Sequence, residues 1–129
     1  MKTIVRYTLT ILLTLTLFSF SYSIDEVVSA IKSGDASKMS RYFDNLVEIT
    51  LNERSNSYSK SQAEIILKDF FGNNNVKNFQ VVHKGTSNDA EFCIGSLSTR
   101  GGEFRTTIFM KTRGDKKVLQ ELRFEGLGN

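Results

Sequence analysis

The sequence contains no proline and no tryptophan, and only one cysteine and one histidine among its 129 residues. A single cysteine excludes an intramolecular disulfide, and one cysteine with one histidine cannot build a Cys/His zinc site. The composition is otherwise that of an ordinary globular protein, since 40% of the residues are hydrophobic and 24% are charged. A chain of this length favours one domain.

Charge is also missing from a segment near the N-terminus. Lys2 and Arg6 precede an uncharged run rich in Leu, Ile, Phe and Thr, and serines occupy positions −3 and −1 before Ile24. This is the pattern of a secretory signal peptide. A transmembrane anchor, the alternative, needs about 20 apolar residues, whereas this run is shorter and is interrupted by threonines. We therefore expect a signal peptide over residues 1–23 and a single mature domain over residues 24–129.

The expected cleavage changes the charge and the location of the protein. No cysteine lies near the cut, so a lipid-modified N-terminus is not available. We expect an exported protein, periplasmic or secreted, with no stable membrane anchor after cleavage. Loss of Lys2 and Arg6 lowers the net charge from +3 to +1. Because nucleic-acid binding needs clustered positive charge, nucleic acid is not an expected partner.

Helical spacing marks the start of the mature chain. Apolar residues from Ile24 to Ile31 recur as one face of a short amphipathic helix. Gly34 is placed to end this helix, and Asp35 is placed to cap a second one. The second helix is expected to end near Leu46.

A strand and a third helix follow. Alternating β-branched residues over 46–51 predict the strand, and the polar residues 52–57 predict a turn. The third helix has the clearest local signal, because Ser59 and Gln62 form a capping box ahead of apolar residues at helical spacing. Gly72, followed by three asparagines, is expected to end it.

The rest of the chain changes to alternating strands. Short polar and glycine-bearing links separate them, which predicts antiparallel hairpins. The four expected strands cover residues 78–84, 91–98, 103–112 and 118–125. Three helices and one strand before a four-stranded meander indicate an α+β fold, in which the helices pack on a curved, mainly antiparallel sheet.

The strand registers follow from placing apolar residues on one face. The pairs expected from links at Gly114–Lys116 and Gly101 are Met110–Gln120, Ile108–Leu122, Thr106–Phe124, Ile94–Ile108 and Phe92–Met110. Arg105 and Glu125 are then a cross-strand pair on the outer face. Cys93 also falls on the outer face, opposite to His83, so a Cys–His nucleophilic pair is not expected.

Four polar side chains fall on the expected inner face. His83 and Gln120 would face each other across a span that fits a small ligand, and a histidine there is a candidate general acid or base. The alternatives are a His83 bonded to backbone or solvent, a cross-strand bond between Ser96 and Thr106, and an internal hydrogen bond from Gln120 to a tyrosine. The candidate ligand-binding residues are His83, Gln120, Tyr42, Tyr58, Thr106 and Ser96.

Three strings resemble a known family. They are Tyr58-Ser59-Lys60-Ser61-Gln62-Ala63-Glu64 leading into Leu67-Lys68-Asp69-Phe70-Phe71, then His83-Lys84-Gly85, and the closing Gln120-Glu121-Leu122-Arg123-Phe124-Glu125. The sequence resembles the DUF4783 family of small exported Bacteroidetes proteins over nearly the whole mature chain. The resemblance implies an NTF2-like, cystatin-related cone, often with a pocket at its open end. It implies no activity, because the family has no assigned function, and no catalytic motif of the wider superfamily matches.

Three functional hypotheses follow. The favoured one is a non-catalytic exported module that binds a small apolar ligand or a protein partner, in the cone or across the sheet. The alternative is an isomerase- or cyclase-like enzyme that uses His83, helped by Gln120 or a tyrosine. The third is a homodimer through the outer sheet face, where Phe109 and Leu119 would otherwise be exposed. No cofactor and no metal is expected, because the sequence has no Gly-rich phosphate loop and no metal-ligand cluster.

Overall fold

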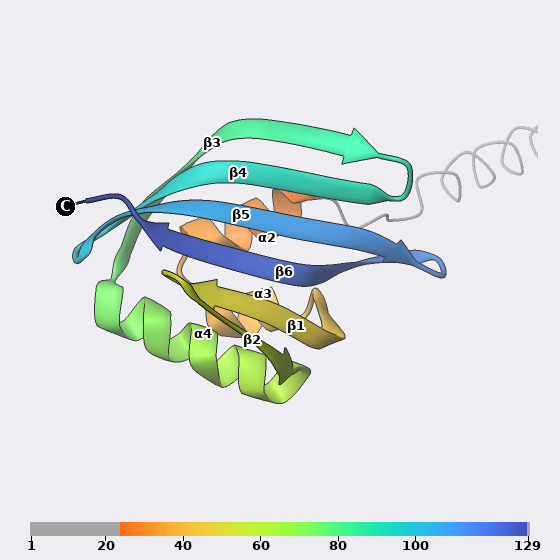
Figure 1. Cartoon of the computed structure of the whole chain (residues 1–129), viewed down its shortest axis with the longest axis horizontal. Helices are drawn as coiled ribbons and strands as arrows, with labels where there is room; N and C mark the ends of the chain where they lie inside the picture. The colour runs from red at the N-terminus through yellow and green to blue at the C-terminus, as the bar shows by residue number, and fades with distance from the viewer. Residues whose placement is uncertain (1–23, 129) are drawn as a thin grey trace, which may run out of the picture.

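The computed structural model describes residues 24–128, in which helices lie against a single curved sheet (Figure 1). The expected signal peptide, residues 1–23, lies outside the described residues. The elements in chain order are α2 (Ile24–Lys32), α3 (Ala36–Ser40), β1 (Phe43–Leu51), β2 (Arg54–Ser59), α4 (Lys60–Asn74), β3 (Val76–Ser87), β4 (Ala90–Thr99), β5 (Gly102–Arg113) and β6 (Lys116–Gly126). None of the helices within residues 24–128 has the length and apolar character needed to cross a membrane. The expected α+β class is confirmed.

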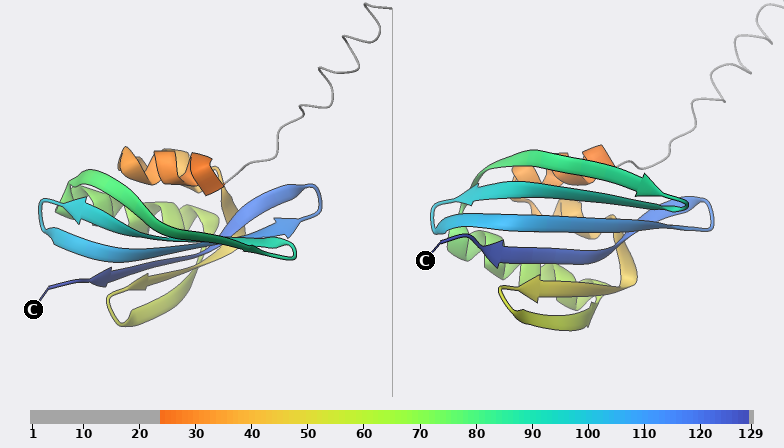
Figure 2. Two further views of the ribbon diagram at one scale, coloured as in Figure 1. Left: turned by 90° about the horizontal axis from the view of Figure 1, so that it is seen from above. Right: turned by 45° about the horizontal axis from the view of Figure 1, so that its top comes forward.

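The sheet has six strands in the order β2-β1-β6-β5-β4-β3. β1 and β6 run parallel, and the other neighbouring strands of the described sheet are antiparallel. The described helices lie on the same side of this sheet (Figure 2). We call that side the inner face and the opposite side the outer face. The expected curved and mainly antiparallel sheet is therefore confirmed.

Helix α2 ends, and helix α3 begins, for the expected local reasons. Gly34 adopts a φ of 65°, which ends α2. The side chain of Asp35 accepts a hydrogen bond from the Lys38 backbone nitrogen at 3.1 Å and so caps α3. The expected extension of α3 toward Leu46 is wrong, because α3 ends at Ser40 and β1 already begins at Phe43, where the chain pairs with β6.

The turn expected over residues 52–57 is also wrong in extent. Asn52, with a φ of 57°, begins a short turn, and the following residues form β2, an edge strand paired with β1. Most of β2 is exposed. An edge strand of this kind is held by backbone hydrogen bonds rather than by buried side chains, so it has no hydrophobic alternation to reveal it.

Helix α4 begins at its predicted cap. The Ser59 hydroxyl accepts a hydrogen bond from the Gln62 backbone nitrogen at 3.3 Å. The buried side chains of α4 are Ala63, Leu67, Phe70 and Phe71. Their spacing turns one face of the helix toward the sheet.

We expect Ser59→Ala to lower the free energy of unfolding by about 1 kcal/mol, because it removes the oxygen that satisfies an unpaired backbone N–H at the start of α4. Urea unfolding followed by circular dichroism measures this. Ser57→Ala, at an exposed position of β2, is the matched control and is expected to change the value by less than about 0.5 kcal/mol. Equal effects of the two substitutions would refute the cap.

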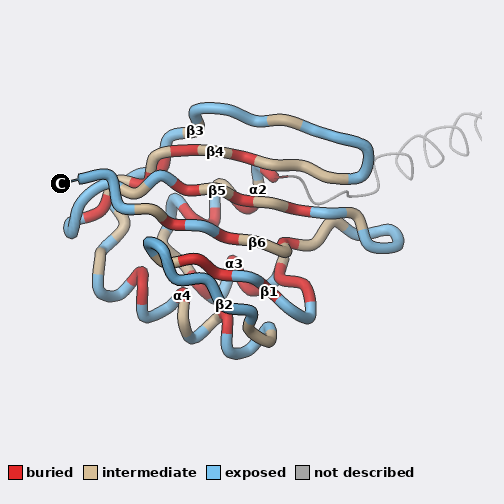
Figure 3. Tube along the Cα trace, in the orientation of Figure 1, coloured by how far each residue is buried: buried red, intermediate tan, exposed pale blue. Residues whose placement is uncertain are grey.

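Apolar side chains fill the space between the helices and the inner face. The Phe124 ring is central, with its centroid 4.5 Å from that of Phe70 and 6.4 Å from that of Phe71. Phe104 adds an edge-on contact to Phe70 at 5.1 Å. The largest fully buried side chains are Phe124, Ile31, Met39, Ile49, Leu67, Leu97, Ile108, Met110, Leu119, Leu122, Val27 and Val47. Buried and less buried positions alternate along β4 to β6 (Figure 3).

The β5–β6 register is confirmed at one end and wrong at the other. Ile108 pairs with Leu122 and Thr106 with Phe124, as expected, but Met110 pairs with Leu119. A register shift between Phe109 and Met110 places Gln120 in a β-bulge. As a result Leu119 is fully buried, not exposed on the outer face.

The β4–β5 register differs from the expected one by one residue. Ile94 pairs with Thr107 and Phe92 with Phe109, so the expected pairs Ile94–Ile108 and Phe92–Met110 are wrong. The strands are joined through a two-residue turn, since Thr99 pairs with Gly102. Every side chain of β4 therefore changes face relative to the expectation.

The side chains of β4 alternate between the two faces of the sheet. A glycine in this strand explains why the set with smaller side chains faces the helices. A Cβ on Gly95 would lie 2.4 Å from Cζ of the Phe79 ring, so that ring occupies the space above the glycine. Phe79 pairs with Leu97, and both are buried on the inner face. Gly95 thus leaves room for an aromatic ring from the neighbouring strand.

Candidate binding face

His83 lies on the outer face, which corrects its expected inner placement. It pairs with Ile94, and the register of the β3–β4 pair shifts between Val81 and His83. The imidazole is exposed, and its ring centroid lies 5.5 Å from that of Phe92. Val81 keeps its expected face, so the bulge is what turns His83 outward.

Cys93 occupies the inner face and is fully buried, which corrects its expected position on the outer face. Burial raises the pKa of the Cys93 thiol, which opposes the formation of a nucleophilic thiolate. His83 and Cys93 still lie on opposite faces, as expected, although the two faces are exchanged. The expected separation of the two groups is therefore confirmed.

Gln120 forms an internal hydrogen bond, but not to a tyrosine. Its Nε2 donates to Oδ2 of Asp44 at 3.1 Å. Asp44 is buried, and its Oδ1 accepts from Nη1 of Arg113 at 2.6 Å and from the Asn45 backbone nitrogen at 2.8 Å. Burial raises the pKa of Asp44, but the hydrogen bonds from Asn45, Gln120 and Arg113 and the charge of Arg113 outweigh it and lower the pKa overall.

We expect Asp44→Asn to remove part of the acid sensitivity of the fold. A carboxylate with a lowered folded-state pKa contributes stability that is present above its unfolded pKa of about 4 and is lost as the pH falls through the folded-state value. At pH 7 the substitution is expected to lower the free energy of unfolding by about 1–3 kcal/mol. Urea titrations between pH 7 and 2.5 measure both effects. Asp115→Asn, in the exposed β5–β6 turn, is the control, and identical pH profiles for the two variants would disprove the role of Asp44.

The remaining candidate residues are not brought together. Thr106 is fully buried and its hydroxyl donates to the Phe104 carbonyl at 3.3 Å. Ser96 pairs with Arg105, not with Thr106, so the expected Ser96–Thr106 bond is wrong. The Tyr42 hydroxyl donates to Oε2 of Glu26 at 3.2 Å. Tyr58 packs at the margin of the core and lines a small hollow beside Ile65 and Ile66 of α4.

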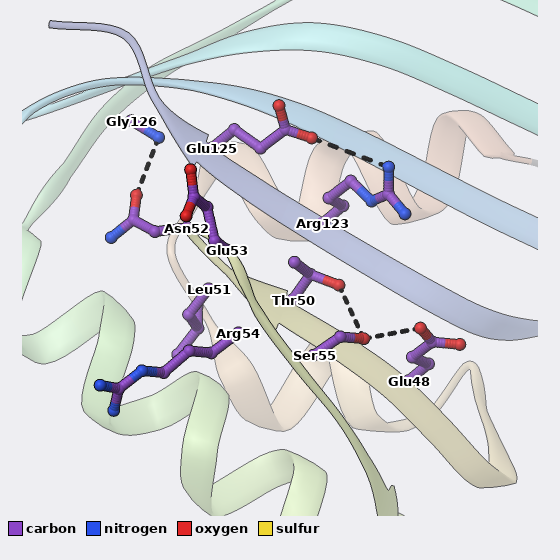
Figure 4. A pocket seen from close by; sticks show the side chains of 10 residues that line it. All are labelled: Glu48, Thr50, Leu51, Asn52, Glu53, Arg54, Ser55, Arg123, Glu125 and Gly126. Atoms are coloured by element: carbon purple, nitrogen blue, oxygen red, sulfur yellow. Dashed lines mark hydrogen bonds and ion pairs between the residues drawn. The ribbon is translucent and has the colours of Figure 1, made fainter.

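The largest hollow that we describe, of about 1010 Å³, lies where the β1–β2 turn meets the end of β6 (Figure 4). It is lined by Glu48, Thr50, Leu51, Asn52, Glu53, Arg54, Ser55, Arg123, Glu125 and Gly126. Within it, the Thr50 hydroxyl donates to Oγ of Ser55 at 3.1 Å, and Ser55 donates to Oε1 of Glu48 at 2.6 Å. The Gly126 backbone nitrogen donates to Oδ1 of Asn52 at 3.0 Å. The hollow is polar and carries charges of both signs.

Charged side chains extend from this hollow along β6. A guanidinium nitrogen of Arg123 lies 3.4 Å from Oε1 of Glu121, and the other lies 3.8 Å from Oε1 of Glu125. Arg105 and Glu125 are cross-strand partners, as expected, but the ion pair that the structure gives Glu125 is with Arg123. These groups form a band of alternating charge on the outer face.

An apolar strip lies beside this charged band. Phe92 and Ile94 of β4 and Phe109 of β5 are half-buried on the outer face, and Phe92 covers Gly85. Val82 on β3 adds a side chain that is 71% exposed. Sequence reasoning placed Phe109 here but missed Phe92 and Ile94, because it paired β4 with β5 one residue out of register.

The described residues show no preformed centre for a metal. Within residues 24–128, no group of three or more His, Cys, Asp and Glu side chains is arranged to hold one. In the same part of the chain, every buried side-chain nitrogen and oxygen has a hydrogen-bond partner. No unsatisfied buried group therefore marks an internal ligand position among these residues.

Comparisons with known proteins identify the family. Residues 24–125 match a domain of unknown function, DUF4783. The chain belongs to the DUF4783 family. A family protein from Bacteroides fragilis shares 33% identity with it at a TM-score of 0.76, over 79% of this chain and 96% of that one. One from Bacteroides ovatus shares 29% identity at a TM-score of 0.78, over 81% and 94%. Among curated proteins, none matches this DUF4783 chain.

More distant neighbours show the fold. A protein titled "Rd1NTF2_04 with long sheet" has a TM-score of 0.63 at 17% identity, over 78% of this chain and 94% of that one. At this identity the likeness concerns the fold alone. The fold of this DUF4783 protein is NTF2-like, as the resemblance implied.

Proposed function

We propose that this DUF4783 protein is an exported, non-catalytic module that binds a protein partner across the outer face of its sheet. The observation that carries the proposal is the character of that face. The described helices all pack on the inner face, while the outer face presents Phe92, Ile94 and Phe109 beside the charged band of β6.

The filled interior favours a protein partner over a small apolar ligand. Phe70, Phe71 and Phe124 occupy the space that a ligand in the cone would need. Of the hollows described here, the largest lies at the margin of the outer face, and its lining is mainly polar and charged. An apolar small molecule gains little binding free energy from such a lining, whereas a polypeptide can pair with it through its own charges and amide groups.

The arrangement of the outer face resembles that of protein interfaces. Aromatic side chains are enriched at the centres of interfaces, and polar, solvent-accessible groups surround them. Here Phe92 and Phe109 are cross-strand neighbours, and the alternating Glu121, Arg123 and Glu125 follow on the next strand. In a two-fold dimer the same face would be applied to its own copy. The partner is therefore either a second copy or another exported protein.

The placement of His83 does not favour the enzymatic alternative. An acid/base histidine in the cone would have to point to the inner face, and His83 is exposed on the outer one. The ring contact of its imidazole is with Phe92, at 5.5 Å between centroids.

The test is site-specific photo-crosslinking of the full chain in a Bacteroides host. A photoreactive amino acid at Phe109 is expected to give a discrete crosslinked protein in the exported fraction, and Arg123→Glu is expected to reduce its yield at least about threefold. The same label at Ile65, which is 59% exposed on α4, is the control. Equal yields at Phe109 and Ile65, or products confined to the cytoplasm, would overturn the proposal. A product of twice the mass of the chain identifies the second copy as the partner.

A further inference from the structure

We propose that removal of the leader completes the fold, because the new α-ammonium group of Ile24 forms a structural ion pair with the Glu91 carboxylate. This inference rests on the export proposed above. It assigns a role to a position where the start of α2, the start of β4 and the start of β6 meet.

The receiving carboxylate is already in place. Ile24, the first residue of α2, is buried, and its backbone nitrogen donates to Oε2 of Glu91 at 3.2 Å. The other oxygen, Oε1 of Glu91, pairs with Nζ of Lys117 from β6. The Glu91 side chain is only 14% exposed. A carboxylate this sheltered interacts with a neighbouring charge under weaker solvent screening than a surface group does.

Cleavage changes the chemistry of the donor without moving it. A signal peptidase adds water across the Ser23–Ile24 amide, which breaks the C–N bond. The water oxygen enters the Ser23 carboxylate, and the Ile24 nitrogen takes up protons to become an ammonium group. An amide nitrogen offers one neutral N–H, whereas an ammonium group offers three donors and a positive charge. Charge-assisted hydrogen bonds are roughly twice as strong as neutral ones.

Space is available for the two further N–H groups. A hollow of about 320 Å³, open to solvent, is lined by both Ile24 and Glu91. Its lining is Ile24, Asp25, Lys84, Gly85, Thr86 and Glu91. One N–H of the ammonium group can therefore keep the bond to Glu91 while water accepts from the others.

The surrounding charges make Glu91 necessary. A positive charge at the start of a helix opposes the helix dipole. Asp25 and Glu26 in the first turn offset this, but Asp25 is engaged by Lys84 at 2.8 Å and Glu26 accepts from the Tyr42 hydroxyl. Glu91 shares its charge with Lys117, yet it already accepts from the Ile24 nitrogen and is the best placed acceptor.

The test begins with the full chain expressed with its leader in a bacterial host. The mass of the N-terminal peptide of the purified protein is expected to show a first residue of Ile24. The melting temperature of this protein is then compared with that of a chain that keeps Ser23, in which the Ile24 nitrogen remains an amide. Near pH 6.5 we expect the chain with Ser23 to melt at least about 4 °C lower, a shift that corresponds to a modest stability change in a domain of this size.

The control and the pH dependence separate the ion pair from a general effect of chain length. In Glu91→Gln the difference between the two chains is expected to fall below about one third of its value, whereas in Glu48→Gln it is expected to persist. A paired amine has a raised pKa, so its stabilisation is present below the unfolded value of about 8 and is lost as the pH rises through the folded value. The difference is therefore expected to vanish near pH 10.5.

The outcomes distinguish this inference from the proposed function. An uncleaved chain overturns the inference together with the export on which it rests. A cleaved chain whose first residue is not Ile24 overturns the inference alone. A chain that begins at Ile24 but shows no difference, or an equal difference in Glu91→Gln, overturns the ion pair alone and leaves the outer-face proposal standing.

Discussion

Phe124→Ala is expected to lower the free energy of unfolding by about 3–5 kcal/mol, which is the usual cost of removing a large buried aromatic side chain. The Phe124 ring is 0% exposed and contacts the rings of Phe70 and Phe71. The substitution deletes these contacts and leaves a cavity. The surrounding side chains belong to α4 and to the sheet, which are held in place and cannot move together to close it. Urea unfolding followed by circular dichroism and fluorescence measures the change.

Phe92→Ala is the matched control for this prediction. Phe92 is the same residue type, but it is half-buried on the outer face and covers Gly85. We expect its replacement to cost less than about half as much, because less apolar surface returns to water. A loss below about 1 kcal/mol for Phe124→Ala, or equal losses for the two variants, would show that Phe124 does not fill the interior.

Gly95→Ala is the second substitution with a large expected effect. The added Cβ would lie 2.4 Å from Cζ of Phe79 and 2.7 Å from the backbone oxygen of Gln80. The backbone oxygen is held in the β3–β4 ladder, and Phe79 is itself buried, so neither neighbour can move cheaply. Overpacking of this kind costs about 1–3 kcal/mol, and we expect the upper part of that range in urea unfolding.

Two further variants show whether the Phe79 ring is the cause. Gly72→Ala, in α4, has no atom within 4 Å of the added Cβ, and it is expected to leave stability unchanged or raise it by up to about 1 kcal/mol. Combining Gly95→Ala with Phe79→Leu is expected to cost less than the sum of the two single losses, because the variants share one clash. Strict additivity of the two losses would contradict this packing.

The starts of α3 and α4 and the end of α2 could be predicted closely because their signals are local. Asp35 and Ser59 cap α3 and α4 through backbone nitrogens only three residues away. Gly34 ends α2 through its own φ of 65°. Such signals depend on neighbouring residues in the chain and need no knowledge of the tertiary fold.

The strand registers could not be predicted fully, because β4 has apolar side chains on both faces. Phe92 and Ile94 alternate with Cys93 and Leu97, so hydrophobic periodicity does not choose between the faces. The ring of Phe79 over Gly95 decides which face of β4 points inward. This is a contact between strands that the sequence of β4 alone does not show.

Two β-bulges account for the changed positions of His83 and Leu119. The extra residue near Val82 turns His83 outward, and the one at Gln120 brings Leu119 into the core. Gln120 was correctly expected to find an internal partner, since a buried amide needs one. Its partner, Asp44, was missed because α3 was expected to continue through that position.

The outer-face hollow was missed for a related reason. Residues 52–57 were expected to be a turn, and a turn does not form the second wall of a groove. In the structure β2 pairs with β1 and brings Ser55 beside Glu48 and Thr50. Edge strands with polar side chains carry little sequence signal, so features that depend on them emerge only from the structure.

The most direct test of the filled interior is methyl NMR of the unmodified protein titrated with benzene. The reporting methyl groups are those of Met39, Met110 and Leu122 inside the cone, with the half-buried Ile94 of the outer face for comparison. A filled interior predicts that the methyl resonances of these three internal residues stay unchanged up to millimolar benzene. Saturable shifts of those resonances would contradict it and would return the binding site to the cone.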